Sequence, residues 1–164
     1  MRTSLLILMV AALMAATPVL AQPVVGSGGS GFYVAASLGL DFLGSPEFEL
    51  GLAFGLNNFI TSGIDLRGDF AYGFGNSNLV LFGASAIATL DIGTTFTPYV
   101  GAGPRLIFSN NVIDGNKTSL GLGFLGGAEY DISNDFALFA EFRSNITFGG
   151  GSFSGVGFGG KYNF

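Results

Sequence analysis

The sequence predicts an all-β protein, an eight-stranded antiparallel up-and-down transmembrane β-barrel. Apolar and polar residues alternate with a period of two along most of the chain, and this is the side-chain period of a β-strand. Charged residues make up only 10% of the sequence, against roughly 25% in soluble domains. Beyond the first 20 or so residues, no apolar run approaches the length of a membrane helix. Because hydrocarbon cannot pair with backbone N–H and C=O groups, such a chain can span a membrane only as a closed barrel.

The chain begins with the features of a secretory signal peptide. A cationic residue precedes an apolar run at 4–16, and small residues flank a cleavage position after Ala21. The run is shorter than the roughly 20 residues of a membrane helix, so a membrane anchor is the less favoured interpretation. We expect a signal peptide at 1–21, a flexible periplasmic tail at 22–30 and one barrel domain at 31–164.

Eight extended segments follow, separated by clusters of Gly, Asn, Ser and Pro. The expected strands are 31–42, 47–57, 63–74, 79–92, 95–108, 118–131, 135–147 and 153–164. Each reaches the roughly 9–11 residues that a tilted membrane strand needs. The expected turns are 44–46, Asn57-Asn58, 75–78, Gly93-Thr94, Ser109 to Lys117, Ser133-Asn134 and 149–151. Turns this short favour a meander in which consecutive strands pair.

The alternation assigns one face of each strand to lipid and the other to the lumen. In the seventh segment, Phe136 and Phe142 hold even positions, whereas Glu141 and Arg143 hold odd positions. After the expected signal peptide, every Asp, Glu, Lys and Arg has an odd number except Asp114, which lies in an expected loop. A soluble barrel such as a lipocalin would need charges over its exterior, and this chain has too few for that interpretation.

The lumen face carries charges of both signs, and we expect them to form ion pairs. The expected lumen charge network is Glu49, Asp65, Arg67, Asp69, Arg105, Glu129, Glu141, Arg143 and Lys161. An eight-stranded barrel is just wide enough for its own side chains to fill, and unpaired charges there would be costly. Phe139 favours an occluded lumen, whereas inward glycines such as Gly121 and Gly123 leave space. The alternative is therefore a narrow porin-like channel for small solutes.

The composition excludes several classes of function. The chain contains no cysteine and no histidine, which removes the usual zinc sites, the Ser-His-Asp and Cys-His nucleophile systems and imidazole bases. We expect no catalytic residue, no cofactor and no metal site, and hence no enzyme. The net charge is −5 and the chain has no basic cluster, so nucleic acid is not an expected partner.

Three local features have competing interpretations. Residues 121–126 match the dinucleotide pattern G-x-G-x-x-G, but that pattern needs a following helix, and we expect a continuous strand of inward glycines here. Glu47 and Glu49 could form an acid–base or calcium pair, but we expect them at a solvated rim. Pro104 removes one ladder hydrogen bond from a strand that is paired on both sides. We expect a bulge or local break there, eased by Gly103.

The final segment carries the most specific resemblance to a known family. The chain ends in Gly157-Phe158-Gly159-Gly160-Lys161-Tyr162-Asn163-Phe164, an aromatic-x-Phe terminus. Together with Pro98 to Gly103 and Tyr130 to Leu138, it resembles the small porin-family outer-membrane barrels of the OmpA and OmpX type. The resemblance covers nearly the whole chain after the signal peptide. It implies that Tyr162 and Phe164 form the signal read by the barrel-assembly machinery.

The resemblance also implies a bacterial outer-membrane location, with membrane lipid as the surroundings. Enzymatic barrels of this type that modify lipid A rely on a histidine, which this chain lacks. We therefore expect a monomeric integral barrel with short surface loops and a structural role in membrane integrity. With the N-terminus in the periplasm, the connections near 43–46, 75–78, 109–117 and 148–152 would face the cell exterior.

Overall fold

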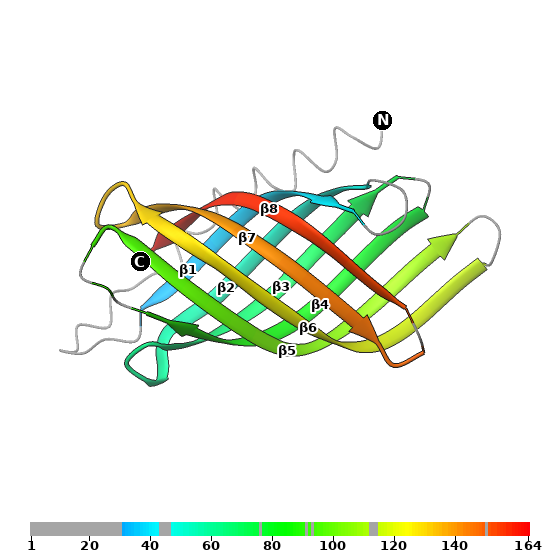
Figure 1. Ribbon diagram of the computed structural model, residues 1–164, viewed down its shortest axis with the longest axis horizontal. Coiled ribbons are helices and arrows are strands. Elements are labelled where there is room, and N and C mark those ends of the chain that lie inside the picture. Colours follow the sequence, from blue (N-terminus) through cyan, green and yellow to red (C-terminus); the bar gives the residue numbers. More distant parts are fainter. Residues whose placement is uncertain are drawn as a thin grey trace.

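A computed structural model describes residues 31–42, 47–75, 77–90, 92, 94–111, 115–149 and 151–164. The strands are β1 (Phe32–Asp41), β2 (Glu47–Thr61), β3 (Ile64–Phe74), β4 (Ser77–Thr89), β5 (Phe96–Asn111), β6 (Gly115–Asp131), β7 (Phe136–Thr147) and β8 (Ser152–Asn163). Each strand pairs antiparallel with the next, and β8 pairs with β1, which closes the barrel (Figure 1). The expected fold class is confirmed. The expected signal peptide and tail lie outside the described residues.

Burial follows the parity of the residue number within the strands. The buried side chains, such as Tyr33, Glu49 and Arg67, all have odd numbers. The exposed large apolar side chains have even numbers, with the exception of Phe59 near the end of β2. The barrel is therefore apolar outside and polar inside, the inverse of a soluble protein and the arrangement that suits hydrocarbon. No helix in the described part of the chain is long and apolar enough to cross a membrane.

The expected turn at Asn57-Asn58 is wrong. β2 continues through this pair to Thr61, with a shift of register against β3. Asn58 adopts a φ of 55°, its N–H donates to Asp65 Oδ1 at 2.8 Å, and its own Oδ1 accepts from the Gly63 N–H at 2.9 Å. Asparagine tolerates this left-handed conformation better than most residues. Asn58, which predicted a turn, instead forms an irregularity inside β2.

The expected loop from Ser109 to Lys117 is largely strand. β5 and β6 remain paired as far as Asn111 and Gly115, whereas β6 begins to pair with β7 only at Gly121. This hairpin consequently extends beyond the β7–β8 connection (Figure 1). The polar residues of this hairpin lie beyond the apolar band of the barrel. The two strands continue to pair with each other there, outside the membrane.

Candidate functional site

The lumen is the candidate functional site, because most of the polar side chains of the strands point into it. We call the end of the barrel that holds Gly31 and Phe164 the terminal end, and the opposite end the loop end. Near the loop end the lumen is filled by an apolar cluster. The cluster consists of Ala71, Leu81 and Ile107, with Leu79 and Phe153 packed against them.

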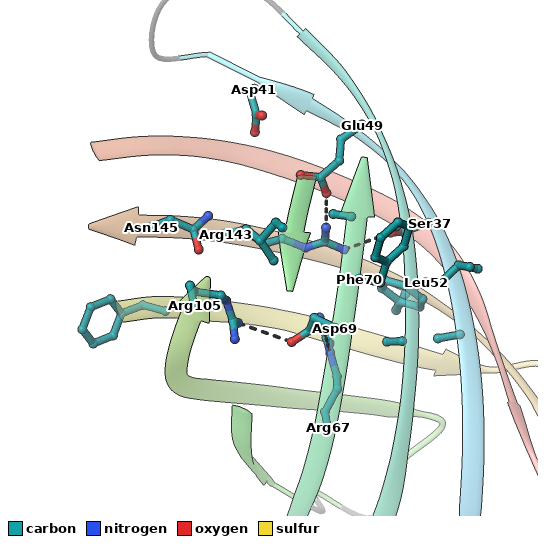
Figure 2. Close-up of a pocket in the computed structure, with 17 residues that line it drawn as sticks. Ser37, Asp41, Glu49, Leu52, Arg67, Asp69, Phe70, Arg105, Arg143 and Asn145 are labelled. Atoms are coloured by element: carbon teal, nitrogen blue, oxygen red, sulfur yellow. Dashed lines mark hydrogen bonds and ion pairs between the residues drawn. The ribbon is translucent and has the colours of Figure 1, made fainter. Parts of the chain in front are cut away.

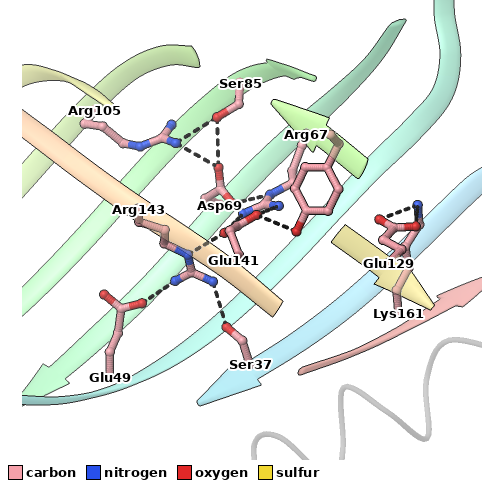
Figure 3. Close-up of polar contacts among 11 residues, drawn as sticks. Ser37, Glu49, Arg67, Asp69, Ser85, Arg105, Glu129, Glu141, Arg143 and Lys161 are labelled. Atoms are coloured by element: carbon pink, nitrogen blue, oxygen red, sulfur yellow. Dashed lines mark hydrogen bonds and ion pairs between the residues drawn. The ribbon is translucent and has the colours of Figure 1, made fainter. Parts of the chain in front are cut away.

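The middle of the lumen holds a connected network of charged side chains centred on Glu141, whose side chain is fully buried (Figure 3). Arg67 donates from Nη1 and Nη2 to its two carboxylate oxygens at 2.6 and 2.9 Å. Arg143 donates from Nε to Glu141 Oε1 at 2.5 Å, and from Nη1 to Glu49. The Tyr99 hydroxyl donates to Glu141 Oε2 at 3.0 Å. Glu141 thus bonds directly to side chains from β3 and β5, and Arg143 of its own strand links it to Glu49 of β2.

Asp69 extends the network across the barrel. It accepts from Arg67 Nε at 2.5 Å and from the Ser85 hydroxyl at 3.2 Å. Arg105 Nη2 donates to Ser85 Oγ at 2.8 Å and lies 3.4 Å from Asp69 Oδ2. Ser37 accepts from Arg143 Nη2 at 2.9 Å. In the described part of the barrel, every buried side-chain nitrogen and oxygen has a hydrogen-bond partner, so this interior is polar without being unsatisfied.

Three of the predicted lumen charges, Glu129, Lys161 and Asp65, lie nearer the terminal end, apart from this network. Lys161 Nζ donates to Glu129 at 2.9 and 3.1 Å and lies 4.3 Å from the centroid of the Tyr33 ring. Asp65, which the sequence also assigns to the network, accepts the Asn58 N–H but forms no ion pair with another described residue.

Sequence reasoning missed the uncharged members of this network. Ser37, Ser85 and Tyr99 bond to its arginines and carboxylates. Each has an odd number, as does Tyr33, so the parity that identified the lumen charges could also have identified them.

The inward glycines do not leave the lumen empty, because large side chains from neighbouring strands lie over them. A Cβ atom would lie 2.4 Å from the Tyr33 ring at Gly55, 2.8 Å from the Tyr99 ring at Gly127, and 2.6 Å from the Phe139 ring at Gly159. Each of these glycines directly opposes its aromatic partner across the ladder. The missing side chain makes room for the partner's ring, so a small residue and a large one together fill the lumen.

Pro104 interrupts the ladder between β4 and β5, as the sequence predicts. Gly83 pairs with Arg105 and Ala86 with Ala102, but the pairs between these positions are missing. The register is the same on both sides of the gap. The expected local break is therefore present, and the expected alternative of a bulge is wrong, because no residue is inserted.

A lumen arginine compensates for the lost bond. Ala84 and Pro104 oppose each other in the hydrogen-bonded phase of the ladder, so proline leaves the Ala84 carbonyl without its usual donor. Arg105 Nη1 donates to that carbonyl at 3.1 Å. A Cβ at Gly103 would lie 1.8 Å from the same oxygen, so only glycine permits the approach.

Apolar side chains fill the lumen again on the terminal side of the network. Ile87, Tyr99 and Leu125 form a buried cluster, and Phe139 is also buried. Between the network and the loop end, the free space is a hollow of about 30 Å³ beside Arg105 and Arg143 (Figure 2). A hollow of this size holds one or two water molecules. At the terminal end the lumen widens into a polar vestibule of about 880 Å³.

The two residues of the expected assembly signal lie at the end of β8. Tyr162 is exposed, and its ring centroid lies 4.9 Å from that of Phe164. The Phe164 ring also packs against Phe32 at 5.8 Å, and its N–H donates to the Phe32 carbonyl at 2.9 Å. These contacts cross the seam between the first and last strands.

Comparison with known proteins supports the same architecture. No family model and no curated protein matches the sequence. Neisserial surface protein A has a solved structure that is 24% identical, with a TM-score of 0.70 over 84% of this chain and 98% of that one. The N-terminal barrel domain of Pseudomonas aeruginosa OprF is 20% identical, with a TM-score of 0.72 over 84% of this chain and all of the domain.

The fold is that of the small outer-membrane β-barrels. These neighbours are eight-stranded bacterial outer-membrane barrels, which supports an outer-membrane location for this chain. The outer-membrane enzyme PagL shares the fold at 13% identity and a TM-score of 0.53, over 79% of this chain and 98% of that one. The fold of small outer-membrane barrels is therefore shared with an enzyme, and function has to be argued from the lumen and the surface.

Proposed function

We propose that this protein is a monomeric, structural outer-membrane barrel whose lumen is closed by its own side chains. The proposal is based on three groups of side chains that follow one another along the lumen. They are the apolar cluster at the loop end, the ion network and the apolar cluster around Tyr99. The hydrogen bonds between Arg67 and Glu141 cross the barrel from β3 to β7. An unhydrated ion cannot pass such a layer without breaking several charge-assisted bonds.

The outer wall supports a role in the membrane itself. Phe48, Phe54 and Phe158 are more than half exposed, so the wall offers lipid a continuous apolar surface. The expected partners are accordingly membrane lipid and, during insertion, the barrel-assembly machinery. The role we propose is not catalytic, because the charged groups of the central network bond to one another and are not free to engage a substrate.

The competing function is a narrow channel. The observation that favours it is that hollows lie on both sides of the cluster of Ile87, Tyr99 and Leu125, and that Arg143, which lines the smaller hollow, keeps 20% of its side chain exposed. A shift of this one side chain would enlarge the hollow at the loop-end side.

Conductance in a planar bilayer separates the two functions. The refolded mature protein should give no steady openings, with folding verified by a mobility shift on a detergent gel. Arg105→Ala and Arg143→Ala test the lumen, and Lys117→Ala, an exposed cation of the β5–β6 hairpin, is the matched control. Steady wild-type openings that change with the lumen variants and not with the control would contradict the closed barrel.

A further inference from the structure

The vestibule at the terminal end has the size of a ligand pocket. Its volume of about 880 Å³ lies within the roughly 300–1,000 Å³ typical of small-molecule sites. The lining is almost entirely polar. It consists of Asn57, Asn58, Asp65, Thr89, Thr94, Thr95, Thr97, Glu129, Asp131, Ile132, Ser133, Asn134, Lys161 and Asn163. The apolar layer around Tyr99 lies beneath it, so the vestibule is a cup that opens only at the terminal end.

Asp65 is a buried carboxylate that faces this vestibule and has no cationic partner in the part of the chain that the structure describes. Its residue is 6% exposed, and its one hydrogen bond among the described residues comes from the Asn58 N–H. The nearby cations are engaged elsewhere: Arg67 pairs with Asp69 and Glu141, and Lys161 with Glu129. An ionised carboxylate can accept several hydrogen bonds, so Asp65, with one printed donor, has acceptor capacity left for an ammonium group supplied by a ligand.

The lining as a whole is negatively charged, as Asp65 is. Three carboxylates face one ammonium, so the formal charge is −2. In the described part of the chain, no group of three or more His, Cys, Asp or Glu side chains is close enough together to hold a metal ion. The carboxylates Asp65 and Asp131 come from β3 and from the end of β6, which are three strands apart in the closed sheet. A longer molecule with several positive groups is therefore better suited to reach both than a single compact cation.

We propose that the vestibule binds a linear polyamine, with one ammonium group at Asp65 and another toward Asp131. Each terminal ammonium has three N–H donors. The threonine hydroxyls and asparagine carbonyls of the lining can accept the hydrogen bonds that the carboxylates do not. The methylene segments between the nitrogens lie across Ile132. Lys161 pairs with Glu129, so the proposal needs only Asp65 and Asp131, which form no ion pair with a lysine or arginine among the described residues.

Titration with spermidine tests the proposal. The refolded mature barrel is placed in zwitterionic micelles, which carry no anionic lipid, and binding is measured by calorimetry and by amide chemical shifts. Asp65→Asn should weaken binding about tenfold, the effect of losing one charged hydrogen bond of about 1.4 kcal/mol. Asp131→Asn should also weaken it and does not touch the Asn58 contact, so it remains informative if Asp65→Asn disturbs β2.

Asp135→Asn is the matched control. Asp135 is exposed in the same turn as Asp131 but does not line the vestibule, so its loss removes the same charge from the same end of the barrel. Binding that is absent at millimolar spermidine, or that all three variants weaken equally, overturns the proposal. So does equal binding of a neutral disaccharide. None of these readouts depends on conductance, so the closed lumen and the amine site can fail separately.

Discussion

At the residue scale, the interior of this barrel depends on matching each large side chain with a glycine in the next strand. Tyr99 and Phe139 fill the lumen because Gly127 and Gly159 oppose them. The same holds for charged residues: a Cβ at Gly83 would lie 2.4 Å from Arg105 Nη1. The glycine that leaves space and the large side chain that occupies this space therefore belong to different strands.

Gly127→Ala should destabilise the barrel, whereas Gly126→Ala should be nearly neutral. At Gly127 the new Cβ would lie 2.4 Å from the Ala140 carbonyl oxygen, but at Gly126 the nearest atom is 3.9 Å away. Overpacking of this kind costs about 1–3 kcal/mol. Urea unfolding of the refolded protein measures both variants, and equal stabilities would show that the Ala140 carbonyl and the Tyr99 ring can both move away at no cost.

Glu141 is the residue whose loss should cost most. Glu141→Gln leaves Arg67 and Arg143 with part of their charge uncompensated, and breaking a buried pair costs about 3–5 kcal/mol. Glu129→Gln is the comparison and should cost less, because Glu129 pairs with Lys161 beside the open vestibule and with no other described cation. The same unfolding assay ranks them, and the reverse order would contradict the central role of Glu141.

At the element scale, β5 tolerates a proline because its neighbour in sequence supplies the missing donor. Arg105 bonds to the Ala84 carbonyl, and β5 pairs regularly with β6 through Pro104 opposite Leu122. Pro104 thus interrupts the backbone pairing of β5 with β4 but not its pairing with β6.

Pro104 and Arg105 should be energetically coupled. Arg105→Met leaves the Ala84 carbonyl without a donor, but in a Pro104→Ala background the restored N–H can take that role. The arginine should therefore cost about 1 kcal/mol less to remove when residue 104 is alanine. A double-mutant cycle by urea unfolding measures the coupling, and additive effects would mean that Arg105 acts only through Asp69 and Ser85.

The end of β8 should matter more for assembly in cells than for stability. Phe164→Ala keeps the backbone bond to Phe32 and removes the ring contacts with Phe32 and Tyr162. We expect less folded barrel in the outer-membrane fraction but refolding in micelles close to wild type. Tyr130→Ala, an exposed aromatic at the same end, is the control, and equal losses for both would contradict a specific signal.

At the scale of the whole molecule, closure of the sheet determines the behaviour of the protein. The β1–β8 ladder, from Tyr33 opposite Asn163 to Asp41 opposite Gly155, leaves no free edge along the apolar band. The ion network then ties strands across the lumen that never touch through their backbones.

The unboiled protein should migrate differently from the boiled protein on a detergent gel. A closed barrel stays compact in detergent until heat opens it, whereas an unfolded chain has its full hydrodynamic size. Mobility that is unchanged by boiling, together with recovery of the protein in a soluble periplasmic fraction, would contradict the membrane barrel.

The sequence by itself determined the number of strands, their meander order and the face of each side chain. Because side chains alternate between the two faces of a strand, the face of every residue is fixed once one face must contact lipid. Parity alone therefore assigned Glu49, Arg105 and Glu141 to the lumen. The sequence also located the break at Pro104, since proline lacks an N–H wherever it lies.

Only the tertiary structure decided which residues meet. Register across strands sets Tyr99 over Gly127 and brings Arg67 to Glu141, 74 positions along the chain, and a list of inward residues carries no such information. The ends of β2, β5 and β6 were misjudged for a related reason: Asn58, Ser109 and Lys117 favour turns locally, but pairing with a neighbouring strand outweighs that preference. Asp65 likewise lies outside the predicted network, because it is located at the vestibule. The parity of a residue number gives the face of the strand but not the position along the barrel axis.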